Sequence, residues 1–370
     1  MSPLRIGVNA LYLIPGGVGG TEIYLRGLLA ALARADHDNQ YFVFTNRETD
    51  PDLVPGAVNF HWAPQPVRAV IRPARILWEQ FALPVAVVRR KIDVLFNPGF
   101  TAPVFSLCPM VTVFHDLQHK RQPENFRWFD LPFWRLLLWA SAHRSAHLLA
   151  DSEATRDDLL AIYRLPAGKV AVAPLGVDRE FFEIARRREP RGYLLAASTL
   201  HPHKNLDGLL RAFADFRRER SGYRLVITGL RGFHTRQLEQ LRAQLGLEND
   251  VEFTGWIPRA ALHDLFAGAD AFIYPSRFEG FGLPVAEALA AGIPTACSNI
   301  RPLTDIAGEA AWLFDPTNQA AMLDAMRRIT SDEELRARLS RAGPERAAHF
   351  TWENTARVTL EAIQRAAGSS

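Results

Sequence analysis

Short apolar runs alternate with longer segments of helical spacing along the whole chain. The apolar runs predict buried strands at 4–10, 41–46, 58–63, 93–98, 110–116, 147–152, 192–198, 223–229, 251–255, 271–276 and 294–299. The segments of helical spacing predict helices at 21–35, 74–90, 118–139, 153–165, 206–220, 234–246, 260–269, 284–291, 318–329 and 350–367. Buried strands that alternate with helices are typical of a parallel sheet covered on both faces. The pattern therefore predicts an α/β fold.

The alternation breaks once, at 172–192, where proline, glycine and a run of charged residues occur together. A chain of 370 residues is also long for one domain. We therefore expect two doubly wound, Rossmann-like domains, 1–175 and 176–350, with a C-terminal helix in 351–370 that crosses back to the first. Ligands bind such sheets at the carboxyl ends of the strands, and two sheets that face each other would form a deep cleft.

Composition narrows the class of protein. The net charge is only +3, and nearly all the positive charge is arginine, with four lysines in the chain. This surplus argues against a nucleic-acid partner. No apolar run reaches the roughly 20 residues that span a bilayer, and the two cysteines, Cys108 and Cys297, suit neither a disulfide framework nor a metal site. A cytoplasmic location is the expectation.

Two segments, 72–91 and 118–139, mix arginine with tryptophan and phenylalanine. They fit amphipathic helices packed on a core. They also fit a face that contacts anionic lipid headgroups. The sequence leaves both interpretations open.

The stretch SRFEGFGLPVAEALAAGIP (276–294) carries the strongest chemical signal. A glycine-rich turn follows a predicted strand, and Pro284 fits the first position of the next helix. The N–H groups of Phe281, Gly282 and Leu283 would then be unpaired and could bind an anion. Two carboxylates flank this turn, Glu279 and Glu287. Carboxylates accept hydrogen bonds from hydroxyl groups, so we expect them to face ribose or sugar hydroxyls.

Lys204 precedes the predicted helix 206–220, for which Asn205 is the expected cap. A lysine beside a helix N-terminus is unfavourable for the helix dipole unless an anion lies between them. The position favours a phosphate ligand.

Two further features lie at predicted strand ends in the first half. The loop 14–22 is rich in glycine, and Thr21 is a candidate N-cap. The loop fits neither a Walker loop nor the dinucleotide fingerprint, and a tight turn explains it equally well. His115 follows the strand at 110–116, where it is either a structural residue or part of a site. No residue has metal-ligand spacing with it.

Taken together, these motifs resemble the retaining GT-B glycosyltransferases of the group 1 family, in particular bacterial mannosyltransferases of polysaccharide assembly. The E-x7-E motif of that family corresponds to Glu279 and Glu287. The resemblance covers nearly the whole chain, because the glycine loop, FHDL, LLADSEATRDDLL, STLHPHKNLDGLLRAF and FTWENTAR occur in the family's order. It implies an acceptor-side first domain and a nucleotide-sugar-binding second domain.

The resemblance also implies roles for individual residues. The implied catalytic residues are His115, Lys204 and Glu279. The implied donor-binding residues are Gly17, Gly19, Thr199, Arg231, Trp256, Ile257, Phe281, Gly282, Leu283 and Glu287. Within this set, Glu287 would bind the ribose and Glu279 the donor sugar, and the segment at Trp256 would lie against the nucleobase. The family usually has an arginine where this chain has Thr199, and Arg231 or His203 would compensate for that loss.

The expected activity is transfer of a hexose from a nucleotide diphosphate sugar to a saccharide or lipid-linked hydroxyl, with no metal and no cofactor. GDP-mannose is the first candidate donor and UDP-glucose the second. A nucleotide-sugar epimerase or hydrolase, and a non-catalytic nucleotide-sugar-binding protein, are the alternatives. Contact with an anionic membrane from the cytoplasmic side is a further expectation.

Overall fold

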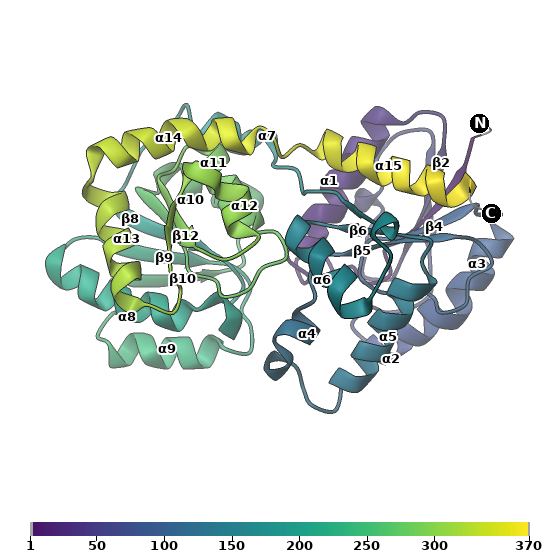
Figure 1. The fold of residues 1–370 in the computed structure, drawn as a ribbon, viewed down its shortest axis with the longest axis horizontal. Helices are drawn as coiled ribbons and strands as arrows, with labels where there is room; N and C mark the ends of the chain where they lie inside the picture. Colours follow the sequence, from purple (N-terminus) through teal and green to yellow (C-terminus); the bar gives the residue numbers. More distant parts are fainter. Residues whose placement is uncertain (1–2, 369–370) are drawn as a thin grey trace. The chain divides into compact units, whose positions relative to one another are not determined.

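The computed structural model describes residues 3–368. The chain divides into two compact units, Met1–Gly176 with Thr351–Ser370 (unit 1) and Val177–Phe350 (unit 2). Each unit is a parallel sheet with helices on both faces (Figure 1). This confirms the predicted α/β fold of two doubly wound sheets.

Unit 1 contains a seven-stranded parallel sheet of order β3-β2-β1-β4-β5-β6-β7. Its strands are β1 (Arg5–Asn9), β2 (Gln40–Thr45), β3 (Phe60–Pro64), β4 (Val94–Asn97), β5 (Met110–Phe114), β6 (His147–Ala150) and β7 (Val170–Val172). Its helices are α1 (Gly20–Ala35), α2 (Arg72–Leu77), α3 (Leu83–Arg89), α4 (Gln118–Arg121), α5 (Leu131–Arg144), α6 (Glu153–Tyr163) and α15 (Trp352–Gly368). The strand order reverses between β1 and β4.

Unit 2 contains a six-stranded parallel sheet of order β10-β9-β8-β11-β12-β13. Its strands are β8 (Tyr193–Ala197), β9 (Arg224–Thr228), β10 (Val251–Gly255), β11 (Ala271–Tyr274), β12 (Thr295–Ser298) and β13 (Trp312–Phe314). Its helices are α7 (Arg179–Ile184), α8 (Leu206–Glu219), α9 (Thr235–Gln244), α10 (Arg259–Gly268), α11 (Leu283–Ala290), α12 (Leu303–Ala307), α13 (Gln319–Ser331) and α14 (Glu333–Ala347). Here the order reverses between β8 and β11.

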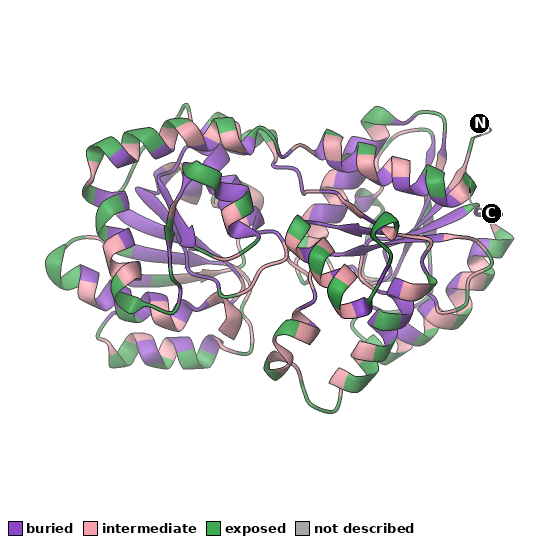
Figure 2. Ribbon diagram, viewed as in Figure 1, coloured by how far each residue is buried: buried purple, intermediate pink, exposed green. Residues whose placement is uncertain are grey.

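Burial follows the pattern that the sequence predicts. The inner strands are buried along their length, and the helices expose one face (Figure 2). In unit 2, α8 and α13 cover one face of the sheet with residues such as Phe213, Phe216 and Met326. None of the described helices is both long and apolar enough to cross a membrane.

The C-terminal helix α15 packs on α1 within unit 1, as predicted (Figure 1). Its first residue, Trp352, fills space that two glycines leave open. A Cβ atom on Gly27 would lie 2.3 Å from the indole, and one on Gly176 would lie 2.2 Å from the backbone nitrogen of Trp352. Thr355 adds a hydrogen bond of 2.6 Å to the carbonyl of Pro174.

Two predicted helices differ from the structure. The stretch 118–139 is not one helix, because α4 ends at Arg121 and α5 begins at Leu131. Pro123 lies between these two helices, and Pro132 is the second residue of α5. The stretch 74–90 is continuous but contains a π-helical turn, Trp78–Ala82, between α2 and α3. The pattern also missed the three-residue edge strands β7 and β13, and the helices α7, α12 and α14.

Candidate functional site

The candidate site lies where the strand order of the unit 2 sheet reverses. In doubly wound sheets, ligands bind at the carboxyl ends of the strands at this switch point. The loop after β8 and the loop after β11 meet here, since β8 and β11 are neighbours. The carbonyl of His203 accepts hydrogen bonds from the backbone N–H of Arg277 (2.8 Å) and the hydroxyl of Ser276 (3.2 Å). These bonds hold the two loops together.

Lys204 and Glu279 form an ion pair across these loops. The Nζ atom of Lys204 lies 2.6 Å from Oε1 of Glu279 and donates to the hydroxyl of Tyr274 at 3.1 Å. The two charged side chains are only 15% and 10% exposed. Burial by itself raises the pKa of Glu279, but the charge and hydrogen bond of Lys204 bring that pKa below its usual value. Glu279 is therefore ionised, and its charge is balanced by the lysine.

Tyr274 was not predicted as a site residue. It is the last residue of β11, and it is buried beside Glu279. Burial, followed by the charge of Glu279, raises the pKa of Tyr274 well above its usual value. The hydroxyl therefore stays protonated and helps to hold Lys204 and Glu279 in place.

The N-terminus of α11 leaves backbone donors available. The helix begins at Leu283, with Gly282 as its N-cap and Pro284 as its second residue rather than its first. Within the part of the chain that the structure describes, no protein acceptor bonds the N–H groups of Phe281, Gly282 and Leu283. Such a terminus favours an anion.

Gly282 is required for this turn. Its φ of 110° lies in a region that side chains rarely adopt, and a Cβ atom there would lie 2.3 Å from the side chain of Leu303. The glycine therefore fixes the direction in which the free N–H groups point.

Glu287 lies one turn into α11, as predicted, and is 4% exposed. The guanidinium of Arg259 lies 3.5 Å from its Oε1 atom and also pairs with Asp178. Burial raises the pKa of Glu287 to about 7, although Arg259 opposes this shift. Near neutral pH this carboxyl group therefore exists in both protonation states.

Arg259 and Asp178 were not predicted as site residues. Arg259 is the first residue of α10, three positions after Trp256, and Asp178 precedes α7. Nothing local in the sequence points either of them toward Glu287. Their contact depends on how α7, α10 and α11 pack.

Asn205 occupies the predicted N-cap of α8, but its side chain does not cap the helix. Its Nδ2 atom instead donates to the carbonyls of Pro275 (3.1 Å) and Pro316 (2.8 Å). Asn205 thus ties the loop that carries Lys204 to the loops after β11 and β13.

His203 is the histidine of the same loop that could replace the missing arginine. Burial, together with the charge of Lys204, lowers the pKa of His203 to about 3. The imidazole is therefore neutral near pH 7. It therefore offers no positive charge to a phosphate.

The remaining predicted donor-binding residues of unit 2 lie around the same strand ends. Thr199 follows β8, and Trp256, which is 60% exposed, and Ile257 follow β10. Arg231 follows β9, but its guanidinium is 61% exposed and pairs with Glu239 at 3.1 Å. That pairing gives no support to Arg231 as the substitute for the missing arginine.

In unit 1 the glycine loop is a closed turn. Glu22 accepts a hydrogen bond of 2.8 Å from the N–H of Gly16, and the N–H of Gly17 bonds the carbonyl of Ile14 at 2.8 Å. The N-cap of α1 is Gly19, with φ 60°. Thr21 is not the cap, because it lies inside the helix and its hydroxyl donates to the carbonyl of Val18.

His115 is fully engaged by the protein. Its Nδ1 atom lies 2.7 Å from Oδ2 of Asp151, and its Nε2 atom lies 2.9 Å from the carbonyl of Pro98. Each ring nitrogen thus lies within hydrogen-bonding distance of an oxygen atom. Burial lowers the pKa of His115, but the charge of Asp151 and these hydrogen bonds raise it above the usual value overall. Because both ring nitrogens are engaged, His115 has no free nitrogen to act as a base.

Asp151 was missed by the sequence prediction. It follows β6, which is the neighbour of β5, and both strands end at the same edge of the sheet. The pair anchors the segment after β4, because His115 holds the carbonyl of Pro98. His115 thus helps to hold the loops at the strand ends of unit 1 in place.

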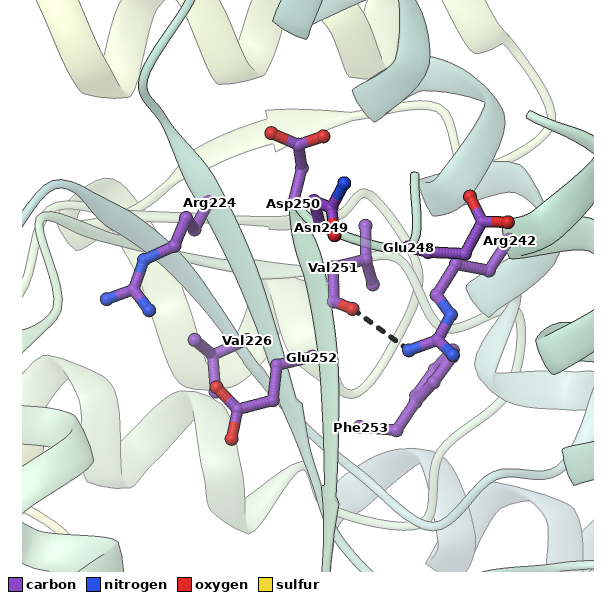
Figure 3. Close-up of a pocket in the computed structure, with 9 residues that line it drawn as sticks. All are labelled: Arg224, Val226, Arg242, Glu248, Asn249, Asp250, Val251, Glu252 and Phe253. Atoms are coloured by element: carbon purple, nitrogen blue, oxygen red, sulfur yellow. Dashed lines mark hydrogen bonds between the residues drawn. The ribbon is translucent and has the colours of Figure 1, made fainter. Parts of the chain in front are cut away.

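Among residues 3–368, no three or more His, Cys, Asp or Glu side chains are grouped so that they could hold a metal ion. A shallow pocket of about 410 Å³ lies at the opposite edge of the unit 2 sheet, where β9 and β10 begin (Figure 3). Its walls mix arginine with acidic residues, and Arg242 there donates to the carbonyl of Val251. Being at the amino ends of the strands, it is separate from the candidate site.

Comparison with known proteins agrees with this architecture. The two doubly wound sheets have the GT-B fold that solved glycosyltransferase structures share. Sucrose-phosphate synthase from Thermosynechococcus elongatus has the same fold, with a TM-score of 0.80 at 21% identity over 99% of this chain and 100% of its own. Residues 177–346 match the family described as glycosyl transferases group 1, and residues 18–181 match glycosyltransferase family 4. The two matches together span residues 18–346, and both are to glycosyltransferase families.

Its relatives include bacterial mannosyltransferases. O-antigen chain mannosyltransferase B of Escherichia coli is 29% identical over 72% of this chain and 73% of its own length. MMP alpha-(1->4)-mannosyltransferase of Mycolicibacterium hassiacum is 27% identical over 94% of this chain and 95% of its own length.

Proposed function

We propose that this protein transfers a hexose from a nucleotide diphosphate sugar to a hydroxyl of a saccharide or lipid-linked acceptor, with retention of the anomeric configuration. GDP-mannose is the proposed donor. The observation that carries the proposal is the convergence of Lys204, Glu279 and the unpaired N–H groups before α11 at the switch point of unit 2. The names of the two mannosyltransferase relatives support the choice of mannose.

The diphosphate would bind the N–H groups of Phe281, Gly282 and Leu283, with Lys204 as the neighbouring cation. These donors are already in place, so they need no rearrangement when charge develops on the leaving diphosphate. Preorganised donors of this kind contribute several kcal/mol to catalysis. The protein itself thus supplies the charge stabilisation, and no metal or cofactor is required in this proposal.

Glu279 would bind hydroxyls of the transferred sugar. Its pairing with Lys204 resolves the repulsion that a lone carboxylate would exert on a nearby phosphate. One oxygen can accept from the lysine while the other accepts from a sugar hydroxyl, since a carboxylate has about four acceptor sites.

Glu287 would bind the ribose hydroxyls. The ionised form is the better acceptor, so Arg259, which opposes the upward shift of its pKa, would be a positioning residue for donor binding. Exposed Trp256, with Ile257, would offer an apolar surface to the nucleobase.

In the proposed step the bond between the anomeric carbon and the diphosphate oxygen breaks, and its electron pair stays on the diphosphate. The acceptor oxygen forms the new bond on the same face of the sugar. The acceptor proton passes to an oxygen of the departing phosphate. The assignment of His115 near the transferred sugar, and of Gly17 and Gly19 near the phosphates, remains a prediction, as does a phosphate contact from Thr199.

Thermal-shift measurements with GDP, UDP and ADP test the donor, because a ligand that binds the folded state raises its apparent stability. We expect the largest shift with GDP. A larger shift with UDP would replace GDP-mannose by a UDP-sugar such as UDP-glucose.

Product analysis with labelled GDP-mannose, with and without a saccharide acceptor, tests the reaction. Transfer predicts an α-linked product that forms only with acceptor. Free mannose at equal rates in both reactions would indicate a hydrolase, and a changed sugar nucleotide an epimerase. Nucleotide binding without any turnover would indicate a non-catalytic binding protein.

A further inference from the structure

Helix α5 exposes apolar side chains where a surface helix normally carries polar ones. Phe133 is 50% exposed, Leu136 64% and Trp139 47%. Their spacing of three residues places them on one stripe of the helix. The opposite stripe, with Leu137 and Leu138, is buried in the core of unit 1. The helix is therefore apolar on both sides.

The helical segment formed by α2, the π turn and α3 has a second stripe of this kind. Leu77 is 59% exposed, Phe81 71%, Val85 49% and Val88 50%. These residues are four, four and three positions apart, so they again lie along one side of the segment. Large apolar groups exposed together, rather than singly, indicate an interaction surface.

The two stripes belong to one region of unit 1. The guanidinium of Arg72 on α2 stacks on the ring of Trp134 on α5 at 4.1 Å. Gln80 of the π turn bonds the backbone of Ala102 and Val104, and Arg144 at the end of α5 bonds the carbonyl of Val104. Figure 1 shows α2 and α5 beside each other.

Loops extend the same region. Phe105 and Leu107, in the segment that Gln80 and Arg144 hold, are 71% and 87% exposed, and Trp128, just before α5, is 83% exposed. We call the exposed apolar side chains of 70–88, 105–107 and 128–139 the apolar face. Figure 2 marks much of these helices as exposed.

Positive charge is concentrated around the apolar face. Residues 66–91 and 126–144 contain nine of the 43 lysines and arginines and two of the 40 acidic residues, a net charge of +7. The remainder of the chain therefore carries −4. One of the two acids, Glu79, is buried, whereas Arg68, Arg72, Arg89, Lys91 and Arg127 are exposed. The basic balance of the protein thus comes from this one region.

We propose that the apolar face is a membrane-docking surface that lies on a bilayer with anionic headgroups. Tryptophan and phenylalanine would enter the boundary between headgroups and acyl chains, and the arginines would contact the phosphates. Amphipathic surfaces with an apolar side and a basic border bind membranes in this way. The net charge of +7 around the apolar face favours an anionic lipid surface, because anionic headgroups attract clusters of Lys and Arg beside a membrane-contacting segment.

Sedimentation of the full chain with vesicles tests the proposal. We expect binding to equimolar phosphatidylcholine and phosphatidylglycerol, and at least tenfold weaker binding to phosphatidylcholine alone. The charge-reversal variant Arg89→Glu with Arg127→Glu should lose binding at least tenfold. The matched control, Arg327→Glu with Arg328→Glu on α13 of unit 2, should bind as the wild type does.

A second pair of variants tests the apolar contribution. Trp128→Ser with Phe133→Ser should weaken binding at least tenfold, while Val58→Ser with Phe233→Ser, two exposed residues outside the apolar face, should not. In the wild type, lipids brominated near the headgroup should quench tryptophan fluorescence. This last measurement requires no variant to fold.

Wild-type protein that stays in the supernatant with anionic vesicles would overturn the proposal. Equal effects of the two charge-reversal variants, or unquenched fluorescence in bound protein, would overturn it as well. None of these results depends on which nucleotide sugar is the donor, so failure here leaves the proposed transfer reaction standing.

Discussion

The Nζ atom of Lys204 lies 2.6 Å from Oε1 of Glu279, 75 residues further along the chain. Lys204 was expected to bind a phosphate, but in the structure it already pairs with the carboxylate of Glu279. The pair is nearly buried, and the hydroxyl of Tyr274 also contacts the lysine. Each member therefore fixes the other beside the N-terminus of α11.

Removing either member of this pair should abolish transfer. We expect Lys204→Met and Glu279→Gln each to lower the rate by about a hundredfold or more, the effect of losing one preorganised charge contact. Initial rates with labelled GDP-mannose provide the measurement. Lys169→Met, which removes a lysine from unit 1, is the matched control and should retain the wild-type rate. Full activity of either site variant would show that the site is placed wrongly.

Glu287 should make stability depend on pH. Because the pKa of Glu287 is raised to about 7 in the folded state, the folded protein binds this proton more tightly than the unfolded chain does. Its contribution is complete at low pH and is lost as the pH rises toward and through about 7. Between pH 5 and pH 8, as approximate limits, the wild type should lose up to about 3 kcal/mol more than Glu287→Gln. Urea unfolding at both values measures this difference, and identical pH dependence would contradict the burial argument.

Arg259→Met should weaken donor binding. Losing the guanidinium removes the interaction that opposes the raised pKa of Glu287, so that pKa should rise further. We expect the KM for the donor to increase and its pH dependence to move to higher pH, with a smaller effect on kcat. Arg242→Met, at the opposite edge of the sheet, is the control. An unchanged KM with a reduced kcat would contradict a positioning role.

Gly282→Ala should destabilise unit 2 and weaken nucleotide binding. Alanine is strained at a φ of 110°, and its Cβ atom would clash with Leu303. A loss of about 1–3 kcal/mol in the free energy of unfolding is expected. Gly168→Ala, where a Cβ atom meets nothing within 4 Å, should have little effect. Equal stability of the two variants would disprove the steric argument.

Asp151→Asn should destabilise unit 1. It removes the carboxylate that pairs with buried His115, and breaking a buried ion pair costs about 3–5 kcal/mol. Because the pKa of His115 is raised, the stabilisation is present at low pH and declines as the pH rises through that value. The difference from wild type in urea unfolding should therefore be larger at acidic than at alkaline pH. A constant difference would argue against a charged His115.

Much of the fold could be predicted from the sequence, since most strands and helices lie within a few residues of the apolar runs that predict them. The short edge strands could not, because three-residue strands such as β13 carry too little pattern. The break in 118–139 was missed although Pro123 signals it, since proline ends a helix. The N-cap at Gly19 was missed for a different reason. Thr21 is the better capping residue in isolation, but Glu22 folds back to Gly16 and starts the helix earlier.

The sequence by itself determined that Lys204, Glu279 and Glu287 each lie beside a strand end or a helix start, and that the turn before α11 offers free N–H groups. Those features depend on residues a few positions apart, so local pattern records them. Only the tertiary structure decided which of them meet. Three strands and three helices lie between Lys204 and Glu279 in the chain, yet β8 and β11 are neighbours in the sheet. The same holds for Asp151 with His115 and for Arg259 with Glu287, because strand order and helix packing follow from burying the whole core at once.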